Sequence, residues 1–330
     1  MSQLVQRVSE PGPWVLGIDL GGTGATGSRI ALEPAGAALG SSRRLLPEVR
    51  TGISEGATNP LDVAETLISA VRVQWPDAPL AAVGIGAPGV ASLAGDPAAE
   101  LPRLVAAAGG ASVALAIDAV TAHLGALAGS GGSVVAVGTG TIAIGTDLRS
   151  IWRRVGGWGH LYDDRGSGAW VGIEGLKAAI LTHDGVTTDA AALLAAAVAR
   201  FGPAPEWPAQ LSTRDDRGAI LADFAADVAA LAGIGDPVAT RIMSTAGTLV
   251  AGTLAAALDP RLPWRASGVG GVFEAGGAFI AGFEAEFVRL APDASLIDPA
   301  GTPLDGAVRL ARLVASGDAP VGHPPFLWLS

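Results

Sequence analysis

The chain has 330 residues, of which 49% are apolar and 16% are charged, so it can bury a sizeable core and does not resemble a disordered chain. Its formal charge is −10, and a surface of that sign repels phosphate backbones and anionic lipids, which argues against nucleic-acid binding. The absence of cysteine excludes disulfides, thiolate zinc sites, iron–sulfur clusters and a cysteine nucleophile. At roughly 150 residues per domain, the length predicts two domains.

Targeting signals are missing from the sequence. The N-terminal segment lacks the continuous apolar stretch of a secretory signal. The longest uncharged run, between Asp118 and Asp147, is interrupted by seven glycines, whereas a spanning helix needs about 20 mostly apolar residues. We therefore expect a soluble cytoplasmic protein with no membrane partner. The one lysine, Lys177, lies outside any Gly-Lys-Ser/Thr sequence, so ATP chemistry here does not use a P-loop.

The first half of the chain alternates short apolar runs with helical patterns. Two hairpins are predicted, each with a glycine-rich turn, and the second repeats the first about 120 residues downstream, which suggests two related lobes. The predicted elements are strands at 14–20 and 28–32, a helix from 60 to 71, strands at 81–86 and 112–117, a helix from 119 to 127, and strands at 133–137 and 142–145.

The second half of the chain is more helical. Apolar residues recur at helical spacing over 176–181, 188–200, 219–231, 236–258, 279–290 and 304–314. A third glycine turn, at 268–271, precedes the helix that begins at 279, and a proline-rich tail follows the last helix. The alternation of buried strands with helices predicts an α/β fold.

The glycine turns suggest a phosphate site. Glycine- and threonine-rich tips let backbone N–H groups converge on an anion, because no Cβ stands in the way. One such tip alone is more simply a tight turn, but two of matched design, at 21–23 and 138–141, favour a polyphosphate held between two lobes. Asp19, beside the first tip, is placed to hold Mg²⁺ through retained waters. The turn at 268–271 can pass backbone beside an adenine, although alone it is a weak signal.

Two further features carry polar side chains. Asp118 follows a buried strand, which suits either a ligand position or a helix N-cap, and the sequence leaves both open. Residues 156–168 combine glycines, a tryptophan, the only tyrosine and acids, a composition that suits a sugar pocket; the alternative is a core tryptophan with solvated acids. His160 is expected to be a structural histidine, and Asn59 before Pro60 is first of all an N-cap.

These stretches together resemble the actin-like ATPase group that includes sugar kinases. Within that group they resemble the BadF/BadG/BcrA/BcrD-type ATPase family, and in particular its N-acetylglucosamine kinases. Asp19-Leu20-Gly21-Gly22-Thr23 is similar to the first phosphate motif, Gly138-Thr139-Gly140-Thr141 to the second, and Ser267-Gly268-Val269-Gly270-Gly271-Val272 to the adenosine motif. Gly156-Gly157-Trp158-Gly159-His160, followed by Asp164 and Gly166-Ser167, is similar to the family's most specific signature.

The resemblance implies a two-lobed, ribonuclease H-like α/β fold with an interlobe cleft. It implies an N-terminal lobe over 1–117, completed by about 304–330, and a C-terminal lobe with helical additions over 118–303. By position it implies that Asp118 is the catalytic base and a sugar ligand, and that ATP with Mg²⁺ is the phosphoryl donor. The nucleotide ligands implied are Gly21, Gly22, Thr23, Gly138, Thr139, Gly140, Thr141, Gly270 and Gly271, with Asp19 for the metal; the other sugar ligands are Asn59, Thr139, Gly157, Trp158 and Asp164.

The chain also departs from the family pattern. Asp163 and Arg165 stand where the motif has glycine and glutamate, and Gly24–Gly27 replaces a shorter Lys-Thr segment, which puts the identity of the sugar in doubt. Activators of the same family use cysteine-bound clusters, which this chain cannot form.

We therefore expect a kinase that phosphorylates the 6-hydroxyl of N-acetylglucosamine, with glucosamine or a related hexose as the alternative acceptor. An aspartate with an ordinary pKa of about 3.9 would be ionised at neutral pH and could take the hydroxyl proton. A nucleotide-gated sugar sensor without turnover is the alternative of another class, whereas a dinucleotide-binding oxidoreductase is disfavoured, because a strand-like segment follows the first glycine turn. A homodimer is the base-rate expectation.

Overall fold

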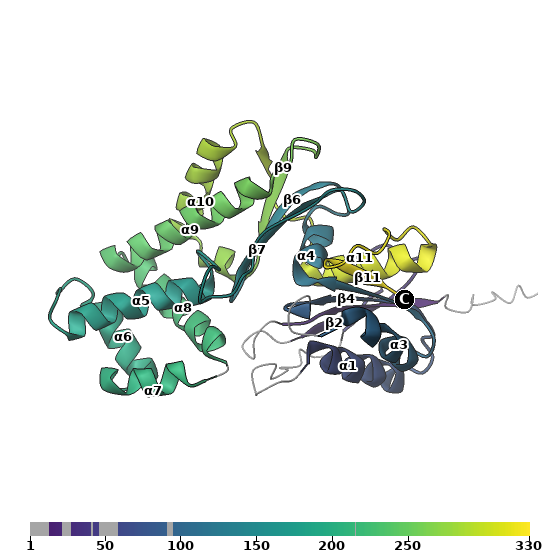
Figure 1. The fold of residues 1–330 in the computed structure, drawn as a ribbon, viewed down its shortest axis with the longest axis horizontal. Helices are drawn as coiled ribbons and strands as arrows, with labels where there is room; N and C mark the ends of the chain where they lie inside the picture. Colours follow the sequence, from purple (N-terminus) through teal and green to yellow (C-terminus); the bar gives the residue numbers. More distant parts are fainter. Residues whose placement is uncertain (1–12, 22–27, 41, 46–58, 91–94, 215) are drawn as a thin grey trace, which may run out of the picture.

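Two β-sheets, each containing one of the predicted hairpins, form the framework of the protein (Figure 1). The computed structural model describes residues 13–21, 28–40, 42–45, 59–90, 95–214 and 216–330. The first sheet has the order β11 (Leu327–Leu329), β5 (Ser112–Ile117), β4 (Leu80–Ala87), β1 (Trp14–Asp19), β2 (Arg29–Pro34) and β3 (Arg44–Leu45). The second has the order β10 (Ser295–Leu296), β9 (Arg265–Val269), β6 (Gly132–Val137), β7 (Thr141–Thr146) and β8 (Trp152–Gly156).

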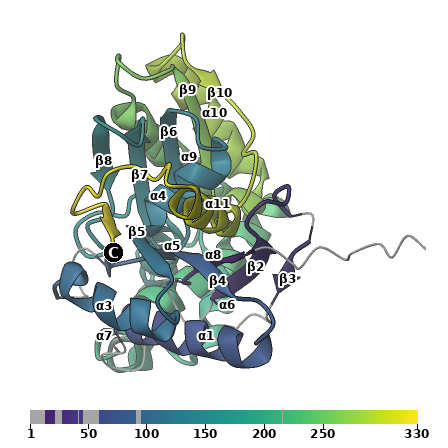
Figure 2. The same ribbon diagram turned by 90° about the vertical axis from the view of Figure 1, so that its right-hand side faces the viewer.

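The first sheet is buried on both faces because its side chains alternate between two helical layers. Leu16 and Ile18 of β1 lie in one apolar cluster with α1 (Pro60–Gln74), which packs against α3 (Pro97–Ala107). Val15 lies in a second cluster with α11 (Pro303–Ser316). Figure 2 shows α11 above the sheet and α1 and α3 below it.

Glycine brings α11 to within backbone contact of this sheet. A Cβ built on Gly84 of β4 would lie 2.2 Å from the Ala307 carbonyl oxygen and 2.8 Å from the Ala311 nitrogen. Real Cβ atoms do not approach backbone so closely, so any larger residue at this position would push the helix away.

The second sheet carries the more helical part of the chain. Helix α9 (Pro237–Ala257) lies against β6, β7 and β8, and α10 (Gly277–Leu290) packs on α9. The remaining helices are α5 (Gly168–His183), α6 (Ala191–Phe201), α7 (Trp207–Ser212) and α8 (Arg217–Gly233), with short 3₁₀ turns at Ala204–Glu206 and Gly271–Ala275. A core of phenylalanine and small aliphatic side chains joins this layer to the sheet.

Helix α4 (Asp118–Ala126) lies between the two groups of elements (Figure 1). It packs against α11 on one side and against β6 on the other. The crossing with α11 is close, since a Cβ on Gly306 would lie 1.8 Å from the Thr121 carbonyl oxygen. Because Asp118 is the first residue of this helix, the predicted base stands where the two sheets approach each other.

Most predicted elements are confirmed, and the two hairpins are antiparallel as expected. The proline-rich tail ends in a strand that was not predicted, β11, which pairs antiparallel with β5. Strand β8 and helix α3 were not predicted. With β11 on the first sheet and α11 packed on β1 and β4, the C-terminal segment lies with the N-terminal elements; the boundary between residues 117 and 118 stays a prediction.

Within the described ranges, no single helix is long and apolar enough to cross a membrane. The helices α8 and α9 pass that test only as a pair, and the chain bends by 117° between them.

Candidate functional site

The two predicted carboxylates, Asp19 and Asp118, meet at one edge of the first sheet. Strands β1, β4 and β5 are parallel, and their register aligns Asp19 with Gly86 and Ala87 with Ile117. The three strands therefore end together, and the carboxyl ends of parallel strands are where α/β proteins bind ligands. The negative charge of Asp118 acts on Asp19 across this edge.

Asp118 is held by the helix that it begins. The N-cap of α4 is Ile117, so the N-cap alternative for Asp118 is wrong, and Asp118 Oδ1 accepts a hydrogen bond from the Ala119 N–H at 2.8 Å. Burial raises the pKa of Asp118; the Ala119 N–H and the charge of Arg154 oppose the shift, and Asp164 adds to it. Our expectation of an ordinary aspartate pKa is therefore wrong, because it took no account of burial.

Asp19 has the surroundings of a cation ligand. Burial raises its pKa to about 7, the charge of Asp118 adds to the shift, and Arg29 opposes it. A buried carboxylate that holds a proton so strongly also gains from a metal ion, so this residue fits the predicted Mg²⁺. Among the residues that the structure describes, no group of three or more His, Asp or Glu side chains could hold a metal ion, so waters and phosphate oxygens would complete the shell.

The second glycine turn is fixed on the N-terminus of α5. The Gly138 N–H donates to the Gly140 carbonyl oxygen at 2.9 Å, and the Gly168 N–H donates to the Gly138 carbonyl oxygen at 2.8 Å. A Cβ built on Gly138 would meet no atom within 4 Å, so the backbone there is open to a ligand. Gly21 of the first turn is half-buried, while Gly22 and Thr23 lie outside the described residues.

The third glycine turn lies directly beside the second. Strands β6 and β9 are parallel, with Ala136 aligned to Val269, so their following turns share one edge of the second sheet. Gly270 has a φ of 109°, and a Cβ there would lie 2.3 Å from the Val137 carbonyl oxygen. Glycine is thus required for this approach, and Gly271 faces open space. The two turns fit a nucleotide that lies along this edge.

Asp164 joins the sugar signature to the second phosphate turn. Its side chain lies against Gly140, since a Cβ there would be 2.8 Å from Asp164 Oδ2. The Thr141 and Gly159 N–H groups donate to this carboxylate, while burial raises its pKa. The residue is only 7% exposed, and its Oδ1 has no partner among the described residues. A buried acceptor without a donor is the group that a substrate hydroxyl would satisfy.

The other predicted sugar ligands differ in placement. Gly157 has a φ of 74°, and its N–H donates to the Thr141 carbonyl oxygen at 2.8 Å, so it lies beside the second turn. Trp158 is 67% exposed, which contradicts the alternative of a core-anchoring tryptophan. Asn59 caps α1, its Oδ1 accepting from the Leu61 N–H at 3.0 Å; this confirms the N-cap, and nothing in the described contacts links it to Asp118.

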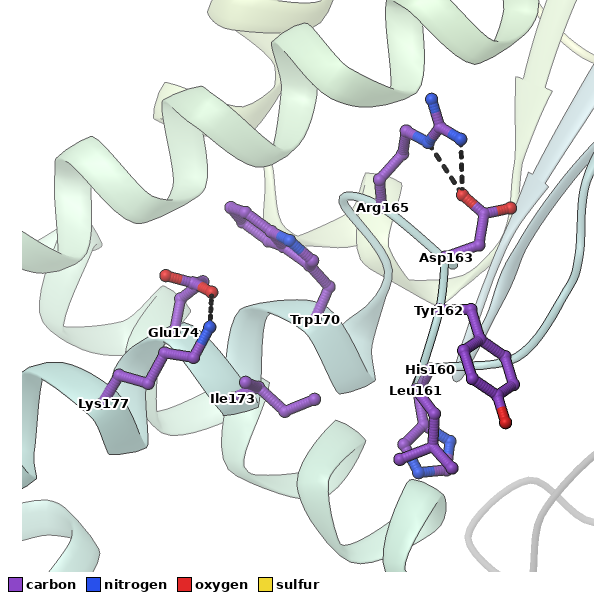
Figure 3. A pocket seen from close by; sticks show the side chains of 9 residues that line it. All are labelled: His160, Leu161, Tyr162, Asp163, Arg165, Trp170, Ile173, Glu174 and Lys177. Carbon is purple, nitrogen blue, oxygen red and sulfur yellow. Dashed lines mark hydrogen bonds and ion pairs between the residues drawn. The ribbon is translucent and has the colours of Figure 1, made fainter.

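A cavity of about 290 Å³ lies beside the loop of residues 159–167. Figure 3 shows the side chains that line it. It is lined by His160, Leu161, Tyr162, Asp163, Arg165, Trp170, Ile173, Glu174 and Lys177. None of the predicted ligands lines it, although His160 and Asp163 belong to the same segment as Asp164. His160 Nε2 is buried and has no partner in the described part of the chain, so this side chain is not the satisfied structural histidine that we expected.

Sequence reasoning missed Arg154. Its charge acts on Asp118, and its guanidinium lies over the Trp158 ring. The one available signal was an arginine two residues before the Gly-Gly-Trp-Gly stretch, in a segment that was not predicted as a strand.

Comparison with known proteins agrees with this geometry. The family model of the BadF/BadG/BcrA/BcrD ATPase family matches residues 16–308. A curated relative, the N-acetylmuramic acid/N-acetylglucosamine kinase of Clostridium acetobutylicum, is 40% identical over 67 residues, which are 20% of this chain and 22% of that protein. The chain therefore matches only about a fifth of that relative's length.

Two solved structures are similar over nearly the whole chain. A candidate N-acetylglucosamine kinase from Chromobacterium violaceum is 25% identical, with a TM-score of 0.62 over 92% of this chain and 99% of the other. A candidate N-acetylglucosamine kinase from Porphyromonas gingivalis is 17% identical, with a TM-score of 0.68 over the same shares, 92% and 99%. The predicted two-lobed α/β fold of the actin-like ATPases is confirmed.

Proposed function

Because the chain belongs to the BadF/BadG/BcrA/BcrD ATPase family, we propose that it is an ATP-dependent sugar kinase that phosphorylates the 6-hydroxyl of N-acetylglucosamine. The observation that carries this proposal is the convergence of three parallel strand ends at the edge that carries Asp19 and Asp118, together with the electrostatic interaction of Asp118 with Asp19 and Asp164. These interactions support a base on the first sheet that acts together with a candidate metal ligand and with the sugar signature of the second sheet. The named relatives support an amino sugar as the acceptor.

In this proposal the glycine turns bind the nucleotide. The open backbone at Gly138 and Gly271 would hold the phosphates and the adenosine, and Asp19 would hold Mg²⁺. When bound, the metal would offset the negative charge of the β- and γ-phosphates. Asp164 Oδ1, which has no partner among the described residues, would accept a hydrogen bond from a sugar hydroxyl, while the indole of Trp158 would cover an apolar face of the ring.

Asp118 would act as the general base. The 6-hydroxyl oxygen forms a bond to the γ-phosphorus while the bond from that phosphorus to the bridging oxygen breaks, which leaves ADP and the sugar phosphate. The hydroxyl proton passes to the Asp118 carboxylate, whose orientation is fixed by the Ala119 N–H at 2.8 Å. A pKa raised by burial favours this role, because a base is most effective when its pKa approaches the working pH.

A coupled assay of ADP release tests the proposal. The panel contains N-acetylglucosamine, glucosamine, glucose and N-acetylmuramic acid, the last because the curated relative's name includes it. We expect ADP release that depends on an amino sugar and is highest with N-acetylglucosamine. Sugar binding without ADP release would instead favour the non-catalytic sensor. Mg²⁺ dependence, a cytoplasmic location and a homodimer belong to the same proposal, and the last is measured by light scattering.

A further inference from the structure

Arg154 lies on β8, the edge strand of the second sheet, and the proposed reaction gives it no role. Its Nε donates to the Gly156 carbonyl oxygen at 3.1 Å, and its Nη2 donates to that of Gly157. Its guanidinium carbon lies 4.4 Å from the centroid of the Trp158 ring. One side chain therefore contacts three consecutive residues of the sugar signature.

The loop that Arg154 contacts needs such a support. Gly156 and Gly157 have φ values of 78° and 74°, and glycines lose more conformational freedom on ordering than other residues. Trp158 is 67% exposed, so burial in the core does not fix its ring. The Gly157 N–H is already bound to the Thr141 carbonyl oxygen, which anchors one end of the loop and leaves the indole to Arg154.

Arginine suits this position better than lysine. A planar guanidinium can donate along its edge to two carbonyl oxygens while its face lies on an aromatic ring, whereas an ammonium group is a compact point charge. Both groups carry the same positive charge, and that of Arg154 acts on Asp118. A substitution by lysine can therefore separate the effect of Arg154 on the loop from its electrostatic effect on Asp118.

We propose that Arg154 is a positioning residue that holds the Gly156–Trp158 loop and so sets the affinity for the sugar, not the rate of transfer. The proposal rests on the proposed function, since it takes this loop to be part of the sugar site. The planar shape of the guanidinium allows Arg154 to fix the loop, and the effect on sugar affinity is transmitted through Trp158.

The first test is Arg154→Lys, which keeps the positive charge but removes the planar guanidinium. We expect the KM for N-acetylglucosamine to rise about tenfold, from loss of the ring contact and of one carbonyl contact, with kcat and the KM for ATP within about twofold of wild type. Arg153→Lys is the matched control, because Arg153 is exposed and its Nε donates to Ala256 on α9. An Arg154→Lys enzyme with an unchanged sugar KM would overturn the proposal.

A double-mutant cycle with Trp158→Leu shows whether Arg154 acts through the indole. We expect the doubly substituted enzyme to have a sugar KM within about twofold of the worse single variant, because both changes remove the same positioned ring. Multiplication of the two fold-changes would mean that the residues act independently, which contradicts the proposal.

Amide hydrogen exchange across residues 156–159, without substrates, gives a readout that does not require activity. We expect faster exchange in Arg154→Lys than in wild type and no change in Arg153→Lys. Unchanged exchange in Arg154→Lys would overturn the claim that Arg154 fixes the Gly156–Trp158 loop, even if the protein is a kinase. Faster exchange in a protein that phosphorylates no sugar would support that claim and refute only the proposed function.

Discussion

The histidine of α4 makes the stability of the protein depend on pH. His123 is fully buried, its Nε2 lies 3.1 Å from the Gly132 carbonyl oxygen, and burial lowers its pKa from 6.5 to about 4. Between these two values the unfolded chain binds a proton at this residue and the folded protein does not. The free energy of unfolding therefore falls as the pH falls through this window.

The size of the effect follows from the two pKa values. Between pH 7 and pH 5, protonation of the unfolded chain at His123 lowers the free energy of unfolding by about 2 kcal/mol. Asp19 acts in the opposite direction, because its raised pKa of about 7 makes the folded state the one that binds a proton as the pH falls. The contribution of His123 must therefore be measured as a difference between proteins that both retain Asp19.

The His123→Gln variant provides that difference, since glutamine can still donate to Gly132 and does not titrate. Urea unfolding followed by circular dichroism in Mg²⁺-free buffer gives the free energy of unfolding at pH 7 and pH 5. We expect wild type to lose about 2 kcal/mol relative to the variant between these values. An equal change in both proteins would refute the assignment of a buried neutral histidine.

Three further substitutions test other parts of the account. Asp118→Asn should lower kcat by about 10²- to 10⁴-fold with folding intact, and near-normal turnover would contradict its role as the base. Asp19→Asn should raise the Mg²⁺ concentration needed for half-maximal ATP use; an unchanged Mg²⁺ titration would count against it. Glu33→Gln, at a buried carboxylate paired with Arg43 and Arg312, should lower the free energy of unfolding by about 3 kcal/mol in urea, whereas a loss below about 1 kcal/mol would show that the pair adds little.

The parts of the fold that the sequence predicts are those with strong local signals. The two hairpins combine apolar runs with glycine turns, and both are present. Helix α3 was missed because Pro102 lies inside it, which argues against a helix from sequence alone. Strand β8 was missed because it carries Arg153 and Arg154, and β11 because only three residues pair with β5.

The candidate site, like the fold, could be predicted only where the sequence carries a local motif. The motifs led to Asp118 and Asp164, and in the structure the charge of Asp164 acts on Asp118. The raised pKa of Asp118 and the contacts of Arg154 could not be predicted, because both depend on how β5, β8 and the 157–167 loop approach one another. Such distances are set by tertiary packing and leave no periodic pattern in the sequence.

The most direct test of the account is to locate the phosphoryl group after reaction of the purified protein with ATP, Mg²⁺ and N-acetylglucosamine. Phosphorus–proton correlation NMR of the product identifies the oxygen that carries the phosphorus. The account predicts a phosphate on the 6-hydroxyl oxygen, formed by wild type and nearly absent with Asp118→Asn. Release of inorganic phosphate alone, or equal product from the variant, would contradict it.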